Sequence, residues 1–158
     1  LETQTGSTSC NVWKKRTFVY VTPEDIGEPV QFSSIDVSFI SLTKVLLPIR
    51  NYLTEDGQIV ALIKPQFEAG REKVGKKGVV RDPAVHLEVI EKSDRLCVYN
   101  CNGAVPSFVF TDQGPEGNIE YLLHLKKRPE GEVIQSSLEV TPEAVVQEAT
   151  QSTGLRKV

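Results

Sequence analysis

A short apolar run at residues 59–63 ends abruptly at a lysine followed by a proline, Lys64-Pro65. Such a run, bounded by turn signals, is typical of a strand that is buried on both faces of a sheet. Proline cannot continue a ladder of hydrogen bonds, so the strand is expected to end at Lys64. In open parallel sheets the carboxyl ends of the strands open onto the ligand crevice. Lys64 is therefore expected where chemistry usually takes place.

The preceding segments complete a strand–helix–strand pattern. Residues 32–39 place Ile35, Val37 and Phe39 on one face and predict a strand. Residues 41–53 carry apolar side chains at helical spacing and predict a helix, followed by a turn at 55–57. This order is that of a βαβ unit, so we expect an α/β fold with a parallel sheet and a right-handed crossover.

The rest of the chain is divided by its turn and capping signals. We expect a strand at 17–21, a helical first turn from Thr22, a long loop at 65–81 and a helix from Asp82 to about Lys92. Residues 93–104 break any periodicity. Strands at 107–111 and 119–125 are spaced as an antiparallel hairpin. We interpret residues 1–13 as a disordered leader and residues 128–158 as a flexible, loosely attached tail with a short helix at about 141–150.

Composition restricts the class of protein. The chain has 158 residues, a quarter of them charged, a net charge of −3 and three cysteines. This predicts one domain with the composition of a soluble globular protein, in a reducing, cytoplasmic setting. There is no apolar run of the ~20 residues that a membrane helix needs and no signal peptide. Neither histidine has a ligand spacing, so no metal is expected.

Three residues are candidates for catalysis on their positions alone. Asp36 lies near a strand end, opposite the apolar set, and is otherwise a turn acid or a helix cap. Lys64 could act as a general base if it is partly buried beside carboxylates, and otherwise simply reaches water. Glu120 alternates out of phase with its apolar neighbours, which by itself favours a solvent-facing strand position.

A basic loop is the candidate for nucleic-acid contact. Its cations could bind phosphates, although a solvated loop is equally consistent with the sequence: Arg71, Lys73, Lys76, Lys77 and Arg81. Cys97 and Cys101 have neither a zinc nor a redox spacing and are expected to be small core residues. The chain contains no G-x-G-x-x-G, P-loop or serine elbow motif.

Four motifs occur in order along the chain: Ile35-Asp36-Val37-Ser38-Phe39-Ile40-Ser41-Leu42, Leu62-Ile63-Lys64-Pro65-Gln66-Phe67-Glu68-Ala69-Gly70, Gly78-Val79-Val80-Arg81-Asp82-Pro83 and Gly114-Pro115-Glu116-Gly117-Asn118-Ile119-Glu120-Tyr121. Together they closely resemble the TlyA family, the hemolysin A group of FtsJ-like ribosomal RNA methyltransferases. The resemblance covers residues 14–127.

The resemblance implies a Rossmann-like fold and methyl transfer from S-adenosylmethionine to a ribose 2′-hydroxyl of ribosomal RNA. FtsJ-like enzymes use a Lys-Asp-Lys-Glu tetrad. By motif, its Asp corresponds to Asp36, its second Lys to Lys64 and its Glu to Glu120. The chemistry is consistent, because a lysine flanked by carboxylates can orient a poorly nucleophilic hydroxyl and remove its proton.

The chain also departs from the family pattern. The N-terminal RNA-binding domain, the first tetrad lysine and the glycine-rich cofactor loop have no counterpart here, so the resemblance implies the C-terminal part of such an enzyme. Two consequences are expected. The strand that carries Asp36 is exposed along one edge. The isolated chain binds S-adenosylmethionine weakly or not at all and is an incomplete, inactive portion, because a glycine-rich first turn holds the cofactor in this fold.

Two other functions compete with the enzyme. The first is a non-catalytic RNA-binding or interaction module that uses the 71–81 loop and the tail. The second is a pore-forming hemolysin, which the lack of a membrane span and of a long amphipathic basic helix makes less favourable. Methyl transfer to a ribosomal RNA fragment would distinguish the enzyme from both alternatives.

Overall fold

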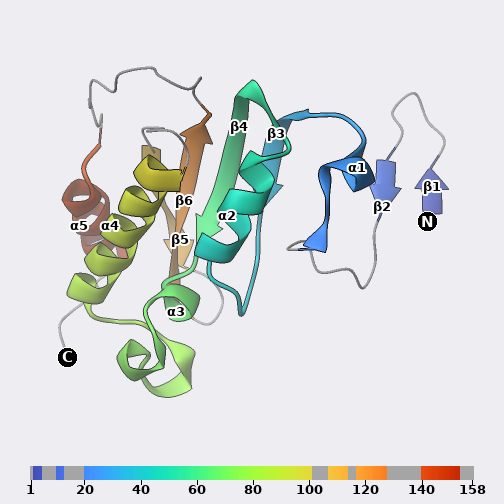
Figure 1. Ribbon diagram of the computed structural model, residues 1–158. Coiled ribbons are helices and arrows are strands. Elements are labelled where there is room, and N and C mark those ends of the chain that lie inside the picture. The colour runs from blue at the N-terminus through green and yellow to red at the C-terminus, as the bar shows by residue number, and fades with distance from the viewer. Residues whose placement is uncertain are drawn as a thin grey trace.

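The computed structural model describes residues 2–4, 10–12, 20–100, 107–113, 117–127 and 140–153. Within these ranges four strands form a mixed sheet in the order β3-β4-β6-β5 (Figure 1). The strands are β3 (Val30–Ile35), β4 (Leu53–Ile63), β5 (Ser107–Gln113) and β6 (Ile119–Lys126). No helix in the described part of the chain is long and apolar enough to cross a membrane.

The βαβ unit is confirmed. β3 and β4 pair in parallel, with Phe32 opposite Gln58 and Ile35 opposite Ala61. Helix α2 (Thr43–Arg50) connects them. The predicted hairpin is also confirmed, because β5 and β6 pair antiparallel, and β6 pairs antiparallel with β4 on its other side. Among the described strands β3 has β4 as its single neighbour, as expected for an edge strand.

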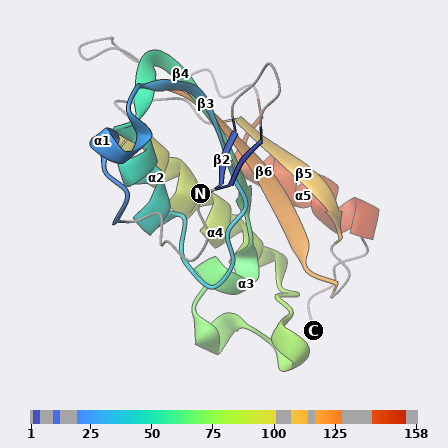
Figure 2. The ribbon, with the colours of Figure 1, turned by 90° about the vertical axis from the view of Figure 1, so that its right-hand side faces the viewer.

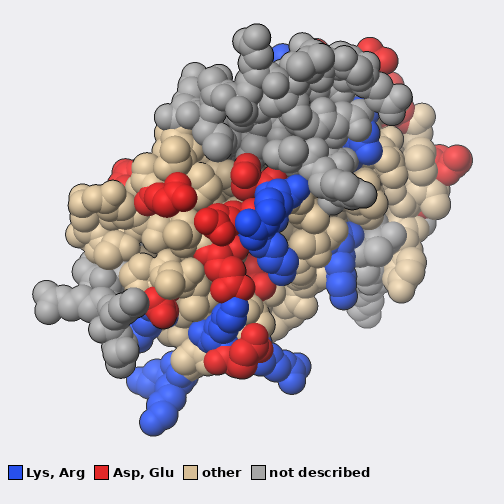
Figure 3. All heavy atoms as spheres, turned by 60° about the vertical axis from the view of Figure 1, so that its left-hand side comes forward, with Lys and Arg blue, Asp and Glu red and all other residues tan. Residues whose placement is uncertain are grey.

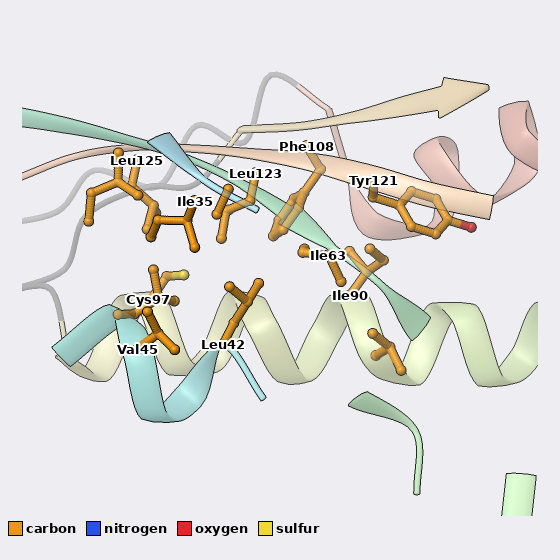
Figure 4. Close-up of a cluster of buried hydrophobic side chains, with 14 of the residues drawn as sticks. Ile35, Leu42, Val45, Ile63, Ile90, Cys97, Phe108, Tyr121, Leu123 and Leu125 are labelled. Carbon is orange, nitrogen blue, oxygen red and sulfur yellow. The ribbon is translucent and has the colours of Figure 1, made fainter. Parts of the chain in front are cut away.

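The hydrophobic core lies between the sheet and its helices. Helices α2 and α4 (Pro83–Asn100) cover one face, and α5 (Pro142–Thr153) packs against α4 and β5 (Figures 1 and 2). Figure 4 shows the apolar side chains of the sheet pointing onto α2 and α4. The fully buried members include Ile63, Ile90, Cys97, Tyr121 and Leu123. The burial of Cys97 agrees with its expected place in the core; Cys101 lies outside the described residues.

Two boundaries around the βαβ unit were wrong. The strand predicted to Phe39 ends at Ile35, because Phe39 adopts φ 63° and the chain turns. The apolar alternation continued past the strand because Val37 and Ile40 also pack against the core from the loop. The turn predicted at 55–57 lies inside β4, which starts at Leu53.

The helix predicted to end near Lys92 continues to Asn100. Two polar residues on this extension have their groups paired, and residues 101–104 of the stretch without periodicity lie outside the described part of the chain. Ser93 is buried, and its hydroxyl donates to the carbonyl oxygen of Val89 at 2.9 Å, while Arg95 pairs with Glu91 one turn earlier. A polar residue inside a helix is tolerated when its hydrogen bonds are satisfied.

The C-terminal helix is part of the core. The structure extends it to Pro142–Thr153 and buries Val145, Val146 and Ala149 against the body of the protein. The prediction of a short helix was right, but its loose attachment was wrong for this segment. Residues 128–139 lie outside the described part of the chain, so the rest of the predicted tail stays a prediction.

The N-terminal segment differs in part from the prediction. Helix α1 (Pro23–Ile26) begins with a capping box between Thr22 and Asp25, as the sequence signal indicated. The interpretation of residues 1–13 as a disordered leader included no strand, whereas β1 (Glu2–Gln4) and β2 (Cys10–Val12) pair antiparallel. Most of the strand predicted at 17–21 lies outside the described residues, and Val21 is not in a strand.

The long loop after β4 contains short helical turns. It consists of α3 (Pro65–Glu68) and two 3₁₀ turns, Arg71–Lys73 and Lys76–Gly78, before α4 begins. In Figure 1 this segment lies below the sheet, at the carboxyl ends of β3 and β4. It therefore lies next to the edge of the sheet where the candidate residues meet.

Candidate active site

Three strand ends bring the candidate residues to one edge of the sheet. Asp36 follows the last residue of β3, Lys64 follows the last residue of β4, and Glu120 is the second residue of β6. The carboxyl ends of the parallel strands β3 and β4 share this edge. The antiparallel strand β6 starts there, with Tyr121 opposite Ile63. The topology thus joins residues that lie far apart in the sequence.

A lysine between two carboxylates is the centre of this edge. Lys64 Nζ lies 2.5 Å from Asp36 Oδ1 and 3.9 Å from Glu120 Oε1. The Lys64 side chain is 13% exposed and that of Glu120 24%, whereas Asp36 is 65% exposed. The aliphatic stem of Lys64 is therefore largely covered, and its amine is directed at the two acids. This arrangement can hold a hydroxyl and exchange a proton with it.

A second carboxylate network lies behind this group. The Glu68 carboxylate accepts hydrogen bonds from the Ser41 hydroxyl and from the Leu42 backbone N–H, both at 2.7 Å. Glu68 belongs to α3, which starts directly after Lys64, and Ser41 and Leu42 lead into α2. The contact connects the segments that follow β3 and β4.

An exposed aromatic ring lies on the loop between β3 and α2. Phe39 is 91% exposed, has a left-handed backbone with φ 63°, and contacts Phe67 with 4.8 Å between ring centroids. A bulky residue rarely adopts positive φ, and such strain is commonly stored at functional sites. The outer face of this ring is available to a planar ligand.

A basic cavity of about 480 Å³ opens in the loop before α4. Four of the five predicted RNA-binding cations line it, together with Asp82: Lys73, Lys76, Lys77 and Arg81. Arg71 is not part of its lining. Lys73 also forms an ion pair with Glu88 at 2.5 Å, so part of its charge is compensated. In Figure 3 basic side chains project from the lower end of the molecule, where this loop lies in Figure 1.

The inner end of the basic loop is fixed to β6 by a buried polar cluster. The Asn118 side chain accepts from the Val80 N–H at 3.2 Å and donates to the Gly78 carbonyl at 3.0 Å. His86 Nε2 donates to the Val80 carbonyl at 3.0 Å, and its Nδ1 accepts from the Tyr121 hydroxyl at 2.9 Å. Burial lowers the pKa of His86, so the neutral ring fits these bonds.

The structure brings Asp36, Lys64 and Glu120 together, as the resemblance to FtsJ-like enzymes implied, whereas position alone favoured a solvent-facing Glu120. The sequence analysis did not identify Glu68, Phe39, Phe67 or the Asn118–His86–Tyr121 cluster as parts of the site. Some signals were present: Phe39 and Glu68 lie inside two of the recurring motifs, and Asn118 lies two positions before Glu120. Their partners could not be read from spacing, because each contact joins distant segments.

The mixed sheet covered by helices, with a βαβ unit at one side, places the chain in the Rossmann-like class of α/β folds. The chain belongs to the FtsJ-like methyltransferase family, whose model matches residues 5–127. The resemblance seen in the motifs is thus confirmed.

Two relatives illustrate the family. The chain is 45% identical over 143 residues to "Putative rRNA methyltransferase YqxC" of Bacillus subtilis, covering 87% of this chain and 50% of that protein. It is 36% identical over 123 residues to "16S/23S rRNA (cytidine-2'-O)-methyltransferase TlyA" of Mycobacterium tuberculosis, covering 75% of this chain and 44% of that protein. The chain therefore spans about half the length of the curated relatives it matches.

Solved structures agree with the fold. A structure described as a putative hemolysin from Streptococcus thermophilus superposes on this chain with a TM-score of 0.76 at 38% identity. The match covers 89% of this chain and 50% of that chain. A second one, from Lactococcus lactis, has a TM-score of 0.76 at 39% identity, covering 89% of this chain and 66% of its own.

Proposed function

We propose that this chain supplies the residues that orient and deprotonate a ribose 2′-hydroxyl of ribosomal RNA during methyl transfer. The observation that carries the proposal is the position of Lys64 Nζ, 2.5 Å from Asp36 and 3.9 Å from Glu120 at the carboxyl edge of the sheet. Both the specific 2′-oxygen acceptor and the RNA substrate are proposals; they agree with the printed name of the Mycobacterium relative.

The chemistry assigns a role to each side chain. Lys64 Nζ accepts the proton of the hydroxyl while the new bond from the ribose oxygen to the methyl carbon forms. Asp36 holds the amine in line, and the carboxylates of Asp36 and Glu120 compensate the charge of the resulting ammonium group. S-adenosylmethionine, when bound, would supply the methyl group from its sulfonium sulfur, which would keep the electron pair of the broken carbon–sulfur bond and leave as S-adenosylhomocysteine. The acceptor side then needs only a neutral amine as base and the two carboxylates.

The described residues account for the part of the site that holds the methyl acceptor, and not for the part that holds the cofactor. The carboxyl ends of the parallel strands β3 and β4 lie side by side, and this class of fold binds nucleotide-like cofactors in the crevice at the carboxyl ends of its strands. No described residue forms a glycine-rich turn after a strand, so we assign no cofactor-binding residue. We still expect the chain by itself to bind S-adenosylmethionine weakly or not at all.

Two features suit RNA. We expect the cations of the cavity, and Arg71 of the same loop, to contact backbone phosphates. The exposed ring of Phe39 is placed to stack on an unstacked base next to the ribose at Lys64. Sequence-specific RNA proteins commonly stack splayed bases on aromatic side chains.

The test is transfer of labelled methyl from S-adenosylmethionine to ribosomal subunits. The chain is assayed alone and joined to the N-terminal half of the Bacillus relative. Alkali cleaves RNA through a free 2′-hydroxyl, so a 2′-O-methyl group leaves a resistant labelled dinucleotide. We expect this product from the joined protein and its loss in Lys64→Met.

Other results would contradict the proposal. Label on a base, or equal labelling by Lys64→Met, would show that the lysine edge does not act on ribose. RNA binding without any transfer by the joined protein would favour the second candidate, a non-catalytic RNA-binding module. The basic cavity is the observation that supports that candidate.

A further inference from the structure

We infer that Glu68 is a positioning residue for the methyl transfer proposed above, on which this inference rests. Its carboxylate joins the loop that carries Asp36 to the turn that carries Lys64. One oxygen accepts from the Leu42 N–H and the other from the Ser41 hydroxyl, each at 2.7 Å. Charge-assisted bonds of this length are among the stronger hydrogen bonds in proteins.

Glu68 and Lys64 belong to the same short helical turn. Lys64 is the N-cap of α3, and the N–H of Phe67 donates to the Lys64 carbonyl at 2.9 Å. Pro65 between them is buried and restricts the backbone. The amine of Lys92 on α4 donates to the Glu68 carbonyl at 3.3 Å, which ties the end of this turn to the core helix.

The loop of Asp36 is held at several points. Asp36 is 65% exposed, so burial does not fix its side chain. The loop is anchored by Ile35 in β3 and by Leu42, which is 2% exposed, and Val37 and Ile40 between them pack against the core. It contacts the Lys64 turn through the Asp36–Lys64 ion pair and the ring pair of Phe39 and Phe67. Glu68 adds two hydrogen bonds at the end of this loop, and so limits how far that end can move relative to Lys64.

The distance between Asp36 and Lys64 depends on how the loop of Asp36 and the turn of Lys64 are each held in place. A shift of the loop by one ångström would separate the 2.5 Å contact and redirect the amine. Misplacement on this scale can cost an enzyme on the order of a hundredfold in rate. Glu68 does not face the reacting atoms, so its effect passes through Asp36 and Lys64.

The test compares Glu68→Ala with Glu68→Gln in the same chain. A glutamine amide can accept from the Leu42 N–H and donate to Ser41 Oγ, which keeps both contacts and removes only the charge. Ser41→Ala removes one contact. Glu148→Gln, on the exposed side of α5, is the matched control for a lost carboxylate. Thermal unfolding verifies that each variant is folded.

The readout is the acylation rate of individual lysines, measured by mass spectrometry. An amine held in a short ion pair is acylated slowly, because the carboxylate stabilises its protonated form and blocks the approach of the reagent. In Glu68→Ala we expect acylation of Lys64 to rise roughly fivefold or more, with the exposed Lys44 and Lys126 unchanged. Glu68→Gln and Glu148→Gln should stay within about twofold of the native chain, and Ser41→Ala should fall between.

Two results would overturn the inference: an unchanged Lys64 rate in Glu68→Ala, or an equal rise at all three lysines, which would indicate general loosening. If Glu68→Ala fails to fold, the Ser41→Ala rate decides in the same way. In the protein joined to the N-terminal half of the Bacillus relative, we expect Glu68→Ala to lower kcat roughly tenfold and to leave KM for RNA unchanged. If acylation behaves as expected but no protein transfers methyl, the proposed function fails while the positioning of Lys64 stands.

Discussion

Tyr121 donates its hydroxyl hydrogen to Nδ1 of His86, with 2.9 Å between the two atoms, and connects β6 with α4 inside the core. Both residues are fully buried, and their rings meet edge to face at 5.7 Å. His86 uses its other nitrogen to hold the Val80 carbonyl. The inner end of the basic loop thus depends on a neutral histidine, and burial lowers the pKa of that histidine.

This pKa shift predicts loss of stability in acid. Above pH about 6.5 the ring is neutral in both the folded and the unfolded chain, so its contribution is fully present. As the pH falls below that value the unfolded chain binds the proton and the folded chain resists it. The free energy of unfolding should then fall by at most about 1.4 kcal/mol per pH unit from this group.

Urea unfolding between pH 7.5 and 5.5 measures this effect. The stability difference between the native chain and His86→Leu should shrink as the pH falls, since the variant lacks the titrating ring. Tyr121→Phe is the control: it keeps the histidine and its pH dependence but lowers stability by about 1 kcal/mol. A difference that stays constant with pH would show that His86 does not cause the acid sensitivity.

Lys64→Met should abolish methyl transfer while the fold is kept. Methionine can follow the covered stem of Lys64, which is 13% exposed, but has no proton acceptor at its end. Loss of a general base typically costs roughly 10²–10⁴-fold in rate. The joined protein described above provides the assay, and circular dichroism provides the control for folding. Activity within tenfold of the native protein would remove Lys64 from the mechanism.

Asn118→Ala should loosen the basic loop. The substitution removes the amide nitrogen that donates to the Gly78 carbonyl and the amide oxygen that accepts from the Val80 N–H. The buried Val80 N–H therefore loses its partner. We expect the free energy of unfolding to fall by about 1–3 kcal/mol. Hydrogen exchange should rise at Val80 but not in β4, and Asn118→Asp, which keeps the acceptor, should retain protection at Val80. Equal exchange in native protein and Asn118→Ala would be inconsistent with this anchor.

Lys76→Gln combined with Lys77→Gln should weaken RNA binding and its dependence on salt. Both lysines line the basic cavity. Each phosphate contact that is lost should reduce the slope of log affinity against log salt by about 0.7 for single-stranded RNA. Filter binding at several salt concentrations measures the slope. Lys44→Gln on α2 is the matched control, and an equal slope in all three proteins would exclude the cavity as the contact.

Val145→Ala should destabilise the whole domain. Val145 is 1% exposed and packs in the core from α5. Removal of its two methyl groups should cost about 1–3 kcal/mol. The matched variant Glu148→Ala, on the exposed side of the same helix, should change stability by less than about 0.5 kcal/mol. Equal unfolding curves for the two variants would restore the view of α5 as a loose appendage.

Local patterns were sufficient for much of the fold. The apolar run before Lys64-Pro65 placed the end of β4, and helical spacing placed α2, because burial on one face imposes a period on the side chains. The same reasoning failed beyond Lys92, where Ser93 bonds to a carbonyl of its own helix and the exposed Arg95 pairs with Glu91 one turn earlier. It also misjudged α5, whose burial depends on surfaces of α4 and β5 that no local pattern reveals.

The sequence by itself determined the family motifs, the end of β4 and the identity of the three candidate residues. Tertiary structure alone decided that Lys64 Nζ meets Asp36 and approaches Glu120, and that Glu68 holds Ser41 and Leu42. The physical reason is range. Secondary structure follows from neighbours within a few residues, whereas the distance between side chains from three strands depends on register, on the direction of each strand and on how the connecting loops are fastened.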